Sequence, residues 1–449
     1  MGALEAKMAR FVTEFPSEDI PPAIIGEAKR SIVNYCGVAL HACNDPSSEI
    51  FVELFAEEGS KPTATILGKR LRTSARNAAL ANGYLGHFDD FDDTHMPSHI
   101  HPTSPILPAV LALAESLPIQ GSELLAAFVI GVEVACRLGR VIAAHAREGA
   151  EHWHPTTTYG VLGAAAAAGR LLGLDDSQMI FAFGIAATQA AGLRVSSGSM
   201  CKPLHAGMSA QNGLLAALLA QRGFTASDRM FESHRGIIGV MTTEHDHSLI
   251  ATGLGEEWEL SAVGLKPYSC GIVTHGLIDT MLELREKEGV TPQSVERIHG
   301  TVRTLAASLT ERRHPQIGLQ GKFSYYHVMA AGLVDGQVLP AQFTDERVRD
   351  PALAAVRDRI DLAADPSLAA DAATATAQLS DGRSYTLNIQ HQTGSPDNPM
   401  TDRQVSDKFK GLARGVLPPE QIERALAALW NIDKLPNVGE MMPLLAAAA

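Results

Sequence analysis

The sequence predicts a mainly α-helical protein, in which a large all-helical domain carries an inserted, smaller α+β domain. Apolar residues recur at helical spacing through most of residues 1–264. Strand-like alternation is concentrated between residues 265 and 395, and helical spacing then returns. Alanine is abundant and aromatic residues make up only 5% of the chain, which favours closely packed helices. We therefore expect residues 1–264 and 396–449 to form the helical domain, with residues 265–395 inserted as the α+β domain.

Each helix of the large domain is predicted from apolar residues spaced three and four positions apart. The first helix should stop before Pro16, because proline breaks helices. The expected helices are 3–15, 23–43, 49–58, 74–85, 106–117, 121–146, 160–172, 178–191 and 206–222, with a further helical region at 403–435.

Strands are expected mainly in the smaller domain. The clearest signal is Asp381-Gly382, because Asp-Gly between two alternating segments is typical of a β-hairpin. Residues 396–399 are rich in proline and should form a linker. The expected strands are 63–67, 295–305, 357–362, 373–379 and 384–389, and the expected helices of this domain are 273–287 and 328–334.

Charge and cysteine content exclude several classes of protein. The formal net charge of -13 argues against nucleic acid as a partner, because phosphate binding needs a basic surface. The five cysteines form no CxxC pair, which indicates reduced thiols in a cytoplasmic protein. The sequence shows neither a signal peptide nor an apolar run of the ~18 residues that a membrane helix requires. We therefore expect no membrane partner.

Residues 81–105 hold the densest group of titratable side chains. They include four of the chain's 17 histidines and four aspartates, and apolar helical patterns flank them on both sides. Buried carboxylates are costly unless they are paired or hydrogen-bonded. Several titratable groups held between packed helices are typical of an acid/base site.

Four polar interruptions of this kind recur in otherwise apolar surroundings, at residues 90–101, 154–156, 202–205 and 266–275. Each places a histidine or lysine beside proline or glycine near the start of a helix. Helix N-termini offer free N–H groups and a positive dipole end, which favour carboxylates and phosphates. Any one of these residues could simply cap a helix or face solvent. Together they predict a cationic, anion-binding pocket lined by bases.

Two other classes of function remain open at this point. One is a metal-dependent hydrolase using His95, His99 and His101, since zinc enzymes use three such ligands and an open position. The other is a non-catalytic helical binding protein. The sequence has no HExxH, no GxSxG and no phosphate-binding glycine motif, and neither Cys201 nor Cys270 stands in a nucleophile signature.

Several motifs, in a fixed order, resemble the MmgE/PrpD family, which includes 2-methylcitrate dehydratase, cis-aconitate decarboxylase and iminodisuccinate epimerase. The likeness covers nearly the whole chain and is carried by separate motifs, so it is specific. The motifs are DFDDT at 90–94, HP at 101–102, HPT at 154–156, KPLHAG at 202–207, KPYSC and THG within 266–276, and KFSYY at 322–326.

The resemblance implies that the smaller domain is a lid, that the active site lies in the cleft between the domains, and that the protein is a homodimer. It also implies no metal and no organic cofactor. The family's site residues fall here on Asp90, Thr94, His101, His154, Lys202 and His275. Our predicted site takes Asp90, His101, His154 and His275 as catalytic residues, and Thr94, Lys202, Lys266 and Tyr326 as substrate-binding residues.

Roles for these residues follow from the reactions of the family, in which a bond next to a carboxylate breaks. We expect Lys202, with help from His101, to hold substrate carboxylates. His154 and His275 are the acid/base candidates, because histidine titrates near neutral pH. Asp90 would act as a base or orient a histidine. Thr94 would position a carboxylate.

We predict a cofactor-independent enzyme that acts on a small di- or tricarboxylic acid, with a 2-methylcitrate dehydratase-like hydro-lyase as the first reading. The alternatives are an epimerase of an iminodisuccinate-like diacid or a cis-aconitate-type decarboxylase. Two departures argue against simple transfer of decarboxylase activity. The spacer between Thr94 and His101 is one residue longer than in that branch, and His327, directly after Tyr326, stands where that branch has tyrosine.

Overall fold

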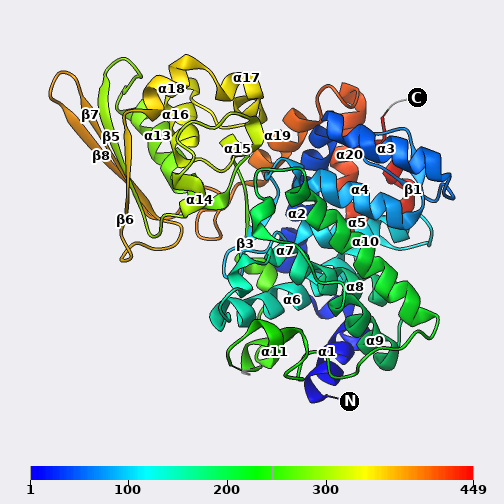
Figure 1. Ribbon diagram of the computed structural model, residues 1–449. Coiled ribbons are helices and arrows are strands. Elements are labelled where there is room, and N and C mark those ends of the chain that lie inside the picture. The colour runs from blue at the N-terminus through cyan, green and yellow to red at the C-terminus, as the bar shows by residue number, and fades with distance from the viewer. Residues whose placement is uncertain (1, 245–246, 448–449) are drawn as a thin grey trace.

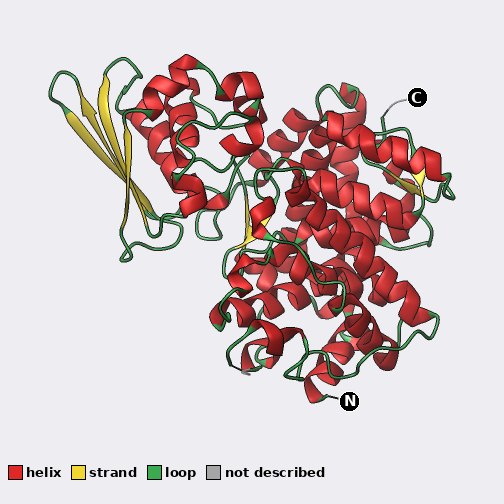
Figure 2. Cartoon of the chain, viewed as in Figure 1, coloured by secondary structure: helices red, strands yellow, loops and turns green. Residues whose placement is uncertain are grey.

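Hydrophobic side chains gather into two main cores in the computed structural model, which describes residues 2–244 and 247–447. The first core draws residues from Leu4 to Leu265 and again from Met400 to Leu445. The second draws residues from Cys270 to Leu379. We term the parts around these cores the large body and the small body. They lie side by side, and the fold is mainly helical, as expected (Figures 1 and 2).

The large body consists of helices of very different length around the long α2, α6 and α10. Its helices are α1 Ala3–Glu14, α2 Pro22–Ala42, α3 Pro46–Glu58, α4 Ala75–Phe88, α5 Thr103–Ala114, α6 Gly121–Ala144, α7 Pro155–Thr158, α8 Gly160–Leu171, α9 Asp176–Ala187, α10 Cys201–Gln221, α11 Ile237–Met241, α12 Ser248–Ala251, α19 Asp402–Ala413 and α20 Pro419–Trp430.

The small body holds a four-stranded sheet with helices on one face (Figure 1). The strand order is β6-β5-β7-β8; β5 and β6 are parallel and the other pairs antiparallel. Its elements are α13 His275–Lys287, β5 Val295–Val302, α14 Ala307–Thr310, α15 Gly318–Gly321, α16 Tyr325–Asp335, α17 Asp345–Val348, α18 Pro351–Arg357, β6 Ile360–Ala364, β7 Ala373–Leu379 and β8 Ser384–Ile389.

The bounds of β7 and β8 confirm the predicted hairpin. The strand predicted from residue 357 begins only at Ile360, because Arg357 still ends α18. Of the described helices, none is both long and apolar enough to cross a membrane.

Two short sheets in the large body correct the expectation of an all-helical domain, although β1 lies inside the strand expected at residues 63–67. β1 (Ala64–Thr65) pairs with β2 (Arg72–Thr73), and β3 (Asp93–His95) pairs with β4 (Val263–Leu265), both antiparallel. Strands of two or three residues are too short to show alternation. The register places Asp93 opposite Leu265, and the Lys266 N–H donates to the carbonyl of Asp92 at 3.2 Å. Residues far apart in sequence thus meet beside β3.

The start of α10 also differs from the prediction, which left residues 194–205 outside a helix. α10 begins at Cys201, so Lys202 lies in its first turn. Pro203 did not prevent this, because the first N–H groups of a helix have no partner within the helix and proline is tolerated there.

Glycines let α10 approach α4 closely. A Cβ on Gly83 would lie 2.7 Å from the Cα of Gly207, too close for any side chain. Because the two backbones are in contact, the first turn of α10 lies beside the last turn of α4. This contact brings Lys202 to His87.

We expect Gly83→Ala to lower the free energy of unfolding by about 1–3 kcal/mol, because the added methyl group overpacks the α4–α10 contact. Gly26→Ala is the matched control on α2, where a Cβ would meet nothing within 4 Å. It should stabilise the protein slightly, since alanine favours helices over glycine. Chemical denaturation of both variants measures the difference; equal stabilities would contradict the packing argument.

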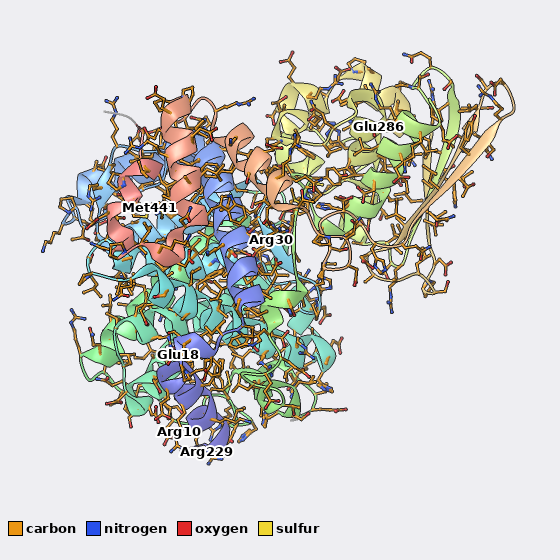
Figure 3. All side chains as sticks on the ribbon, turned by 180° about the vertical axis from the view of Figure 1, so that it is seen from behind. Arg10, Glu18, Arg30, Arg229, Glu286 and Met441 are labelled. Atoms are coloured by element: carbon orange, nitrogen blue, oxygen red, sulfur yellow. The ribbon has the colours of Figure 1, made fainter. Side chains whose placement is uncertain are left out.

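The C-terminal segment returns to the large body along α2. Arg30, labelled in Figure 3, donates from α2 to the carboxylate of Asp402 and to the carbonyl of Met400. α19 is thereby fixed beside α2, with Lys408 directed toward the junction of the two bodies.

Candidate active site

A cavity of about 250 Å³ lies between the two bodies. It is smaller than typical ligand pockets of roughly 300–1,000 Å³, so it suits a small molecule. Six of the eight predicted site residues line it, namely Asp90, Thr94, His101, His154, Lys202 and Lys266. The small body contributes Gly271, Ile272, Val273, Ala306, Leu309 and Phe323. The structure thus brings most of the separate polar segments together.

Asp90 lies at the centre of the charged wall of the cavity. It follows the end of α4 with a φ of 50°, a left-handed conformation that side chains other than glycine seldom adopt. Its Oδ1 accepts hydrogen bonds from Lys202 Nζ at 2.9 Å and Lys266 Nζ at 2.8 Å. Burial opposes ionisation, but the two lysines outweigh it and hold the pKa of Asp90 well below its usual range. Asp90 is therefore a carboxylate that positions two cations.

Each of the two ammonium groups retains a donor for a ligand. A lysine ammonium has three N–H donors. Lys202 uses one for Asp90 and one for His87 Nε2 at 3.1 Å, and Lys266 uses two for the side chain and carbonyl of Asp90. Burial lowers the pKa of Lys202, whereas Asp90 and Asp92 overcome burial at Lys266 and raise its pKa.

His101 presents one ring nitrogen toward the cavity. Its Nδ1 lies 2.7 Å from the carbonyl oxygen of Asp93, which can only accept, so Nδ1 carries the proton. Its Nε2, 3.9 Å from Asp90 Oδ1, is then an unprotonated base. Burial and Lys266 lower the pKa of His101, partly offset by Asp92. The histidine is therefore neutral at pH 7.

His154 also lines the cavity, near His101, and lies directly before α7. Its ring centroid lies 6.2 Å from that of His101, and its Nδ1 lies 3.1 Å from Nδ1 of His205. Its backbone N–H donates to the carbonyl of Gly192, which ties it to the following loop. Burial and the charge of Lys202 hold the pKa of His154 well below its usual range.

His87 and Asp92 lie behind the lysines and were not among the eight predicted site residues. His87 Nδ1 donates to Asp92 Oδ2 at 2.8 Å, which leaves Nε2 to accept from Lys202. Burial and Lys202 lower the pKa of His87 to about 3. Ser104 donates to the same Asp92 oxygen at 2.7 Å. The chain from Ser104 through Asp92 and His87 fixes the position of Lys202.

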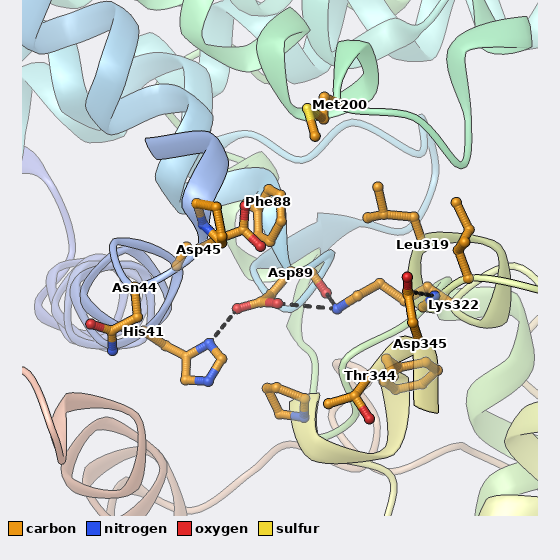
Figure 4. A pocket seen from close by; sticks show the side chains of 16 residues that line it. His41, Asn44, Asp45, Phe88, Asp89, Met200, Leu319, Lys322, Thr344 and Asp345 are labelled. Atoms are coloured by element: carbon orange, nitrogen blue, oxygen red, sulfur yellow. Dashed lines mark hydrogen bonds and ion pairs between the residues drawn. The ribbon is translucent and has the colours of Figure 1, made fainter. Parts of the chain in front are cut away.

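Two further lysines hold the loop that carries Asp90 in place through hydrogen bonds. Lys322, from the KFSYY motif, donates to Asp89 Oδ1 and to the Asp89 carbonyl (Figure 4), and to Ser269 Oγ at 2.8 Å. Lys408 on α19 donates to the carbonyls of Phe91 and Lys266 at 2.7 and 2.8 Å. The small body and the C-terminal helix thus hold the same loop.

Three residues at the mouth of the cavity were not among the predicted site residues: His99, Arg194 and Ser197. His99 has a φ of 56° in the loop between β3 and α5. Arg194 and Ser197 lie at the 3₁₀ turn Arg194–Ser196 before α10. His99 lies in the polar stretch 90–101, where the sequence suggested it only as a metal ligand. No family motif covers Arg194 and Ser197, so only the fold could place them at the cavity.

Two family models match the chain. The MmgE/PrpD N-terminal domain matches residues 6–250, and the MmgE/PrpD C-terminal domain matches residues 268–433. The chain belongs to the MmgE/PrpD family.

Curated relatives align over almost the full length of this MmgE/PrpD chain. It is 26% identical to a cis-aconitate decarboxylase-like protein of Aspergillus oryzae, over 99% of this chain and 98% of the relative. It is 27% identical to a cis-aconitate decarboxylase of Aspergillus terreus, with 98% and 95% covered. It is 26% identical to a human cis-aconitate decarboxylase, with 94% and 90% covered.

Two of the predicted MmgE/PrpD site residues, His275 and Tyr326, are not among the described residues that line the cavity. His275 is buried against Tyr268, and burial and Lys266 lower its pKa to about 3. Its Nδ1 has no hydrogen-bond partner within the described residues. Tyr326 packs its ring against the guanidinium of Arg313, 4.0 Å away.

The departure at His327 does not alter the cavity. His327 is buried, its Nε2 lies 2.9 Å from the carbonyl of Gln342, and its Nδ1 lies 3.1 Å from Arg357. Both ring nitrogens are therefore engaged within the small body. The longer spacer does reach the cavity, since it contains His99.

The three histidines of the metal-hydrolase reading do not converge. His95 is buried with Nδ1 on Ser98 and Nε2 on Glu259, so neither nitrogen is free for a metal. A different trio, His87, His101 and His154, has ring nitrogens within 4.8 Å of one another. That trio fits a dication poorly, because both nitrogens of His87 are engaged and the Lys202 ammonium would repel the ion.

Proposed function

We propose that this chain is a cofactor-independent lyase that decarboxylates a small unsaturated tricarboxylic acid of the cis-aconitate type. The observation that carries the proposal is the pair of ammonium groups on Asp90, facing a small cavity beside His101 and His154. The names of the full-length relatives favour decarboxylation over the other reactions of the family. The sequence first favoured 2-methylcitrate dehydration, which these relatives do not support.

The proposed chemistry breaks the bond between a carbon and its carboxylate. The bonding electrons remain on the carbon and spread into the adjacent double bond and carboxylate, while CO₂ leaves. Lys202 and Lys266 would stabilise the charge that develops on the retained carboxylate, because buried donors act strongly where little water competes. A proton then bonds to the carbon and gives a five-carbon unsaturated diacid.

The proton is proposed to come from a histidine that becomes charged when substrate binds. Burial and the lysines keep His101 and His154 neutral in the free enzyme. The carboxylates of a bound substrate would raise both pKa values, since nearby negative charge favours the protonated form. The site would thus take up its catalytic proton together with the anion.

Binding of an unreactive tricarboxylate should therefore take up protons at pH 7. Because the free histidines have pKa values below 6.5 and the bound ones higher values, affinity should rise as the pH falls from about 8 toward 6. Calorimetry in buffers of different ionisation enthalpy counts the protons. Proton release on binding, or an affinity that decreases as the pH is lowered from about 8 toward 6, would contradict the scheme.

A substrate panel tests the proposed reaction. Purified protein is incubated with cis-aconitate, 2-methylcitrate, citrate and iminodisuccinate, and products are identified by NMR with CO₂ measured in parallel. The proposal predicts CO₂ from cis-aconitate alone. Elimination of water from 2-methylcitrate would instead restore the hydro-lyase reading, and inversion of iminodisuccinate the epimerase reading. Activity should survive dialysis against a chelator.

We also propose that the small body acts as a lid, that the protein is a cytoplasmic homodimer, and that His275 and Tyr326 join the site when the lid closes. What supports the lid is the location of the cavity between residues of both bodies. Small-angle scattering with and without a tricarboxylate tests closure, and sedimentation tests the dimer. An unchanged scattering profile would overturn the lid, and a monomer in sedimentation would overturn the homodimer.

A further inference from the structure

Arg194 stands at the mouth of the cavity on a loop that is fixed from two sides. Trp153 and Leu193 form a β-bridge, and the carbonyl of Gly192 accepts from His154 N–H at 3.0 Å. On the other side, a Cβ on Gly198 would lie 2.7 Å from Nη1 of Arg312, so that guanidinium packs against the loop. The loop is therefore held by contacts that do not involve the two terminal amino groups of Arg194.

The guanidinium of Arg194 is largely uncommitted. Its Nε donates to the carbonyl of Trp153 at 3.2 Å. Its two terminal amino groups have no hydrogen-bond partner in the described part of the chain. Burial lowers the pKa of His99, another residue that lines the cavity, and the positive charge of Arg194 lowers it further. A planar guanidinium with both amino groups free is suited to bind a carboxylate through two parallel hydrogen bonds.

The charged residues inside the cavity do not provide a cation for every carboxylate of a tricarboxylate, and Arg194 provides one more. Lys202 and Lys266 share Asp90, so these three residues together contribute a single net positive charge. The neighbouring histidines are neutral before substrate binds. One ammonium pair can hold the carboxylates at the reacting end, but a further carboxylate directed outward would lie unpaired near low-dielectric walls, which is costly. Arg194 supplies the cation at that outer position.

We propose that Arg194 is a specificity-determining residue that binds the outermost carboxylate of the substrate, so that the cavity selects tricarboxylates over dicarboxylates. This inference rests on the proposed function in that both concern the same cavity, but it concerns binding and does not depend on which bond the enzyme breaks. Ser197, three residues after Arg194, also lines the cavity and has a hydroxyl group that could donate to the same carboxylate.

The residues on either side of Arg194 in the sequence are exposed and do not belong to a hydrophobic core. Val195, the next residue, is 87% exposed, and Leu193 is also exposed. Because the two apolar side chains beside Arg194 are about half or more exposed, replacing the charged side chain should have little effect on the fold. An effect of the replacement on ligand binding would then report on the guanidinium itself.

The test is calorimetric binding of two unreactive acids at pH 7. Propane-1,2,3-tricarboxylate carries three carboxylates, and methylsuccinate has the same carbon skeleton without one terminal carboxylate. The wild-type protein should bind the tricarboxylate at least ~10-fold more tightly. Arg194→Gln should lose about that factor for the tricarboxylate and leave methylsuccinate binding unchanged. Arg194→Lys should fall between, since it keeps the charge but loses the paired geometry.

Arg403→Gln is the matched control, because this arginine is 91% exposed on α19, outside the cavity lining. It should bind both acids as the wild type does. The inference is overturned if Arg194→Gln binds the tricarboxylate as tightly as the wild type, if it weakens both acids equally, or if the wild type shows no preference. A wild-type preference that Arg194→Gln abolishes, in an enzyme that releases no CO₂ from cis-aconitate, would refute the proposed reaction and leave this inference standing.

Discussion

Lys202→Met is expected to lower kcat/KM for the tricarboxylate by about 10²- to 10³-fold, the cost of removing one preorganised donor from a developing negative charge. Methionine is about as long as the methylene stem of lysine and lacks the ammonium group. Asp90 retains Lys266, so its carboxylate stays paired. His87 loses its donor at Nε2 but retains Asp92. The loss should therefore be one of activity more than of folding.

Lys287→Met serves as the control for Lys202→Met. Lys287 is 61% exposed at the end of α13 and pairs with Glu283 one turn away. Thermal unfolding of both variants establishes that they are folded, and steady-state kinetics then compares them. Near wild-type activity in a folded Lys202→Met protein would remove the ammonium pair from the mechanism.

His101→Asn is expected to lower kcat by about 10²- to 10⁴-fold, the range found for groups that transfer a proton in the transition state. Asparagine can still donate to the carbonyl of Asp93 from a position near Nδ1, so the local structure has a substitute for that hydrogen bond. It offers no counterpart to Nε2. KM should change less than kcat, because Lys202 and Lys266 remain.

The pH profile separates proton transfer from a structural effect. In the wild type, the acid or base limb that belongs to His101 should appear in kcat, and the variant should lose it. His152→Asn is the control, with a side chain that is 76% exposed. A variant with reduced kcat and an unaltered pH profile would assign His101 a positioning role instead.

The sequence predicted those elements whose pattern is local. The bounds of β7 and β8 were predicted correctly because the alternation and the Asp-Gly turn both lie inside one short segment. β3 and β4 were missed because each has three residues and each is stabilised by the other, 170 residues away along the chain. The start of α10 was missed because residues 194–205 are rich in glycine and serine, which is typical of a loop, so the first turn of the helix was assigned to that loop.

The residues of the candidate site fall into the same two groups, those that a local pattern predicts and those that only the fold brings together. Asp90, His101, His154 and Lys202 could be found because each belongs to a polar motif inside apolar sequence. His87 could not, since it lies within an ordinary helix and acquires its role only when Lys202 approaches through the Gly83–Gly207 contact. Arg194 lies in a loop that has no periodicity, and its importance follows from its place at the mouth.

The most direct test of the account is to follow cis-aconitate in D₂O with the wild-type protein, measuring CO₂ and the organic product by NMR in one experiment. We expect one CO₂ per substrate consumed and a five-carbon unsaturated diacid with one deuterium at the carbon that received the proton. Both signals should disappear together in Lys202→Met. Consumption of cis-aconitate without CO₂, or no consumption by a folded protein that binds tricarboxylates, would contradict the account.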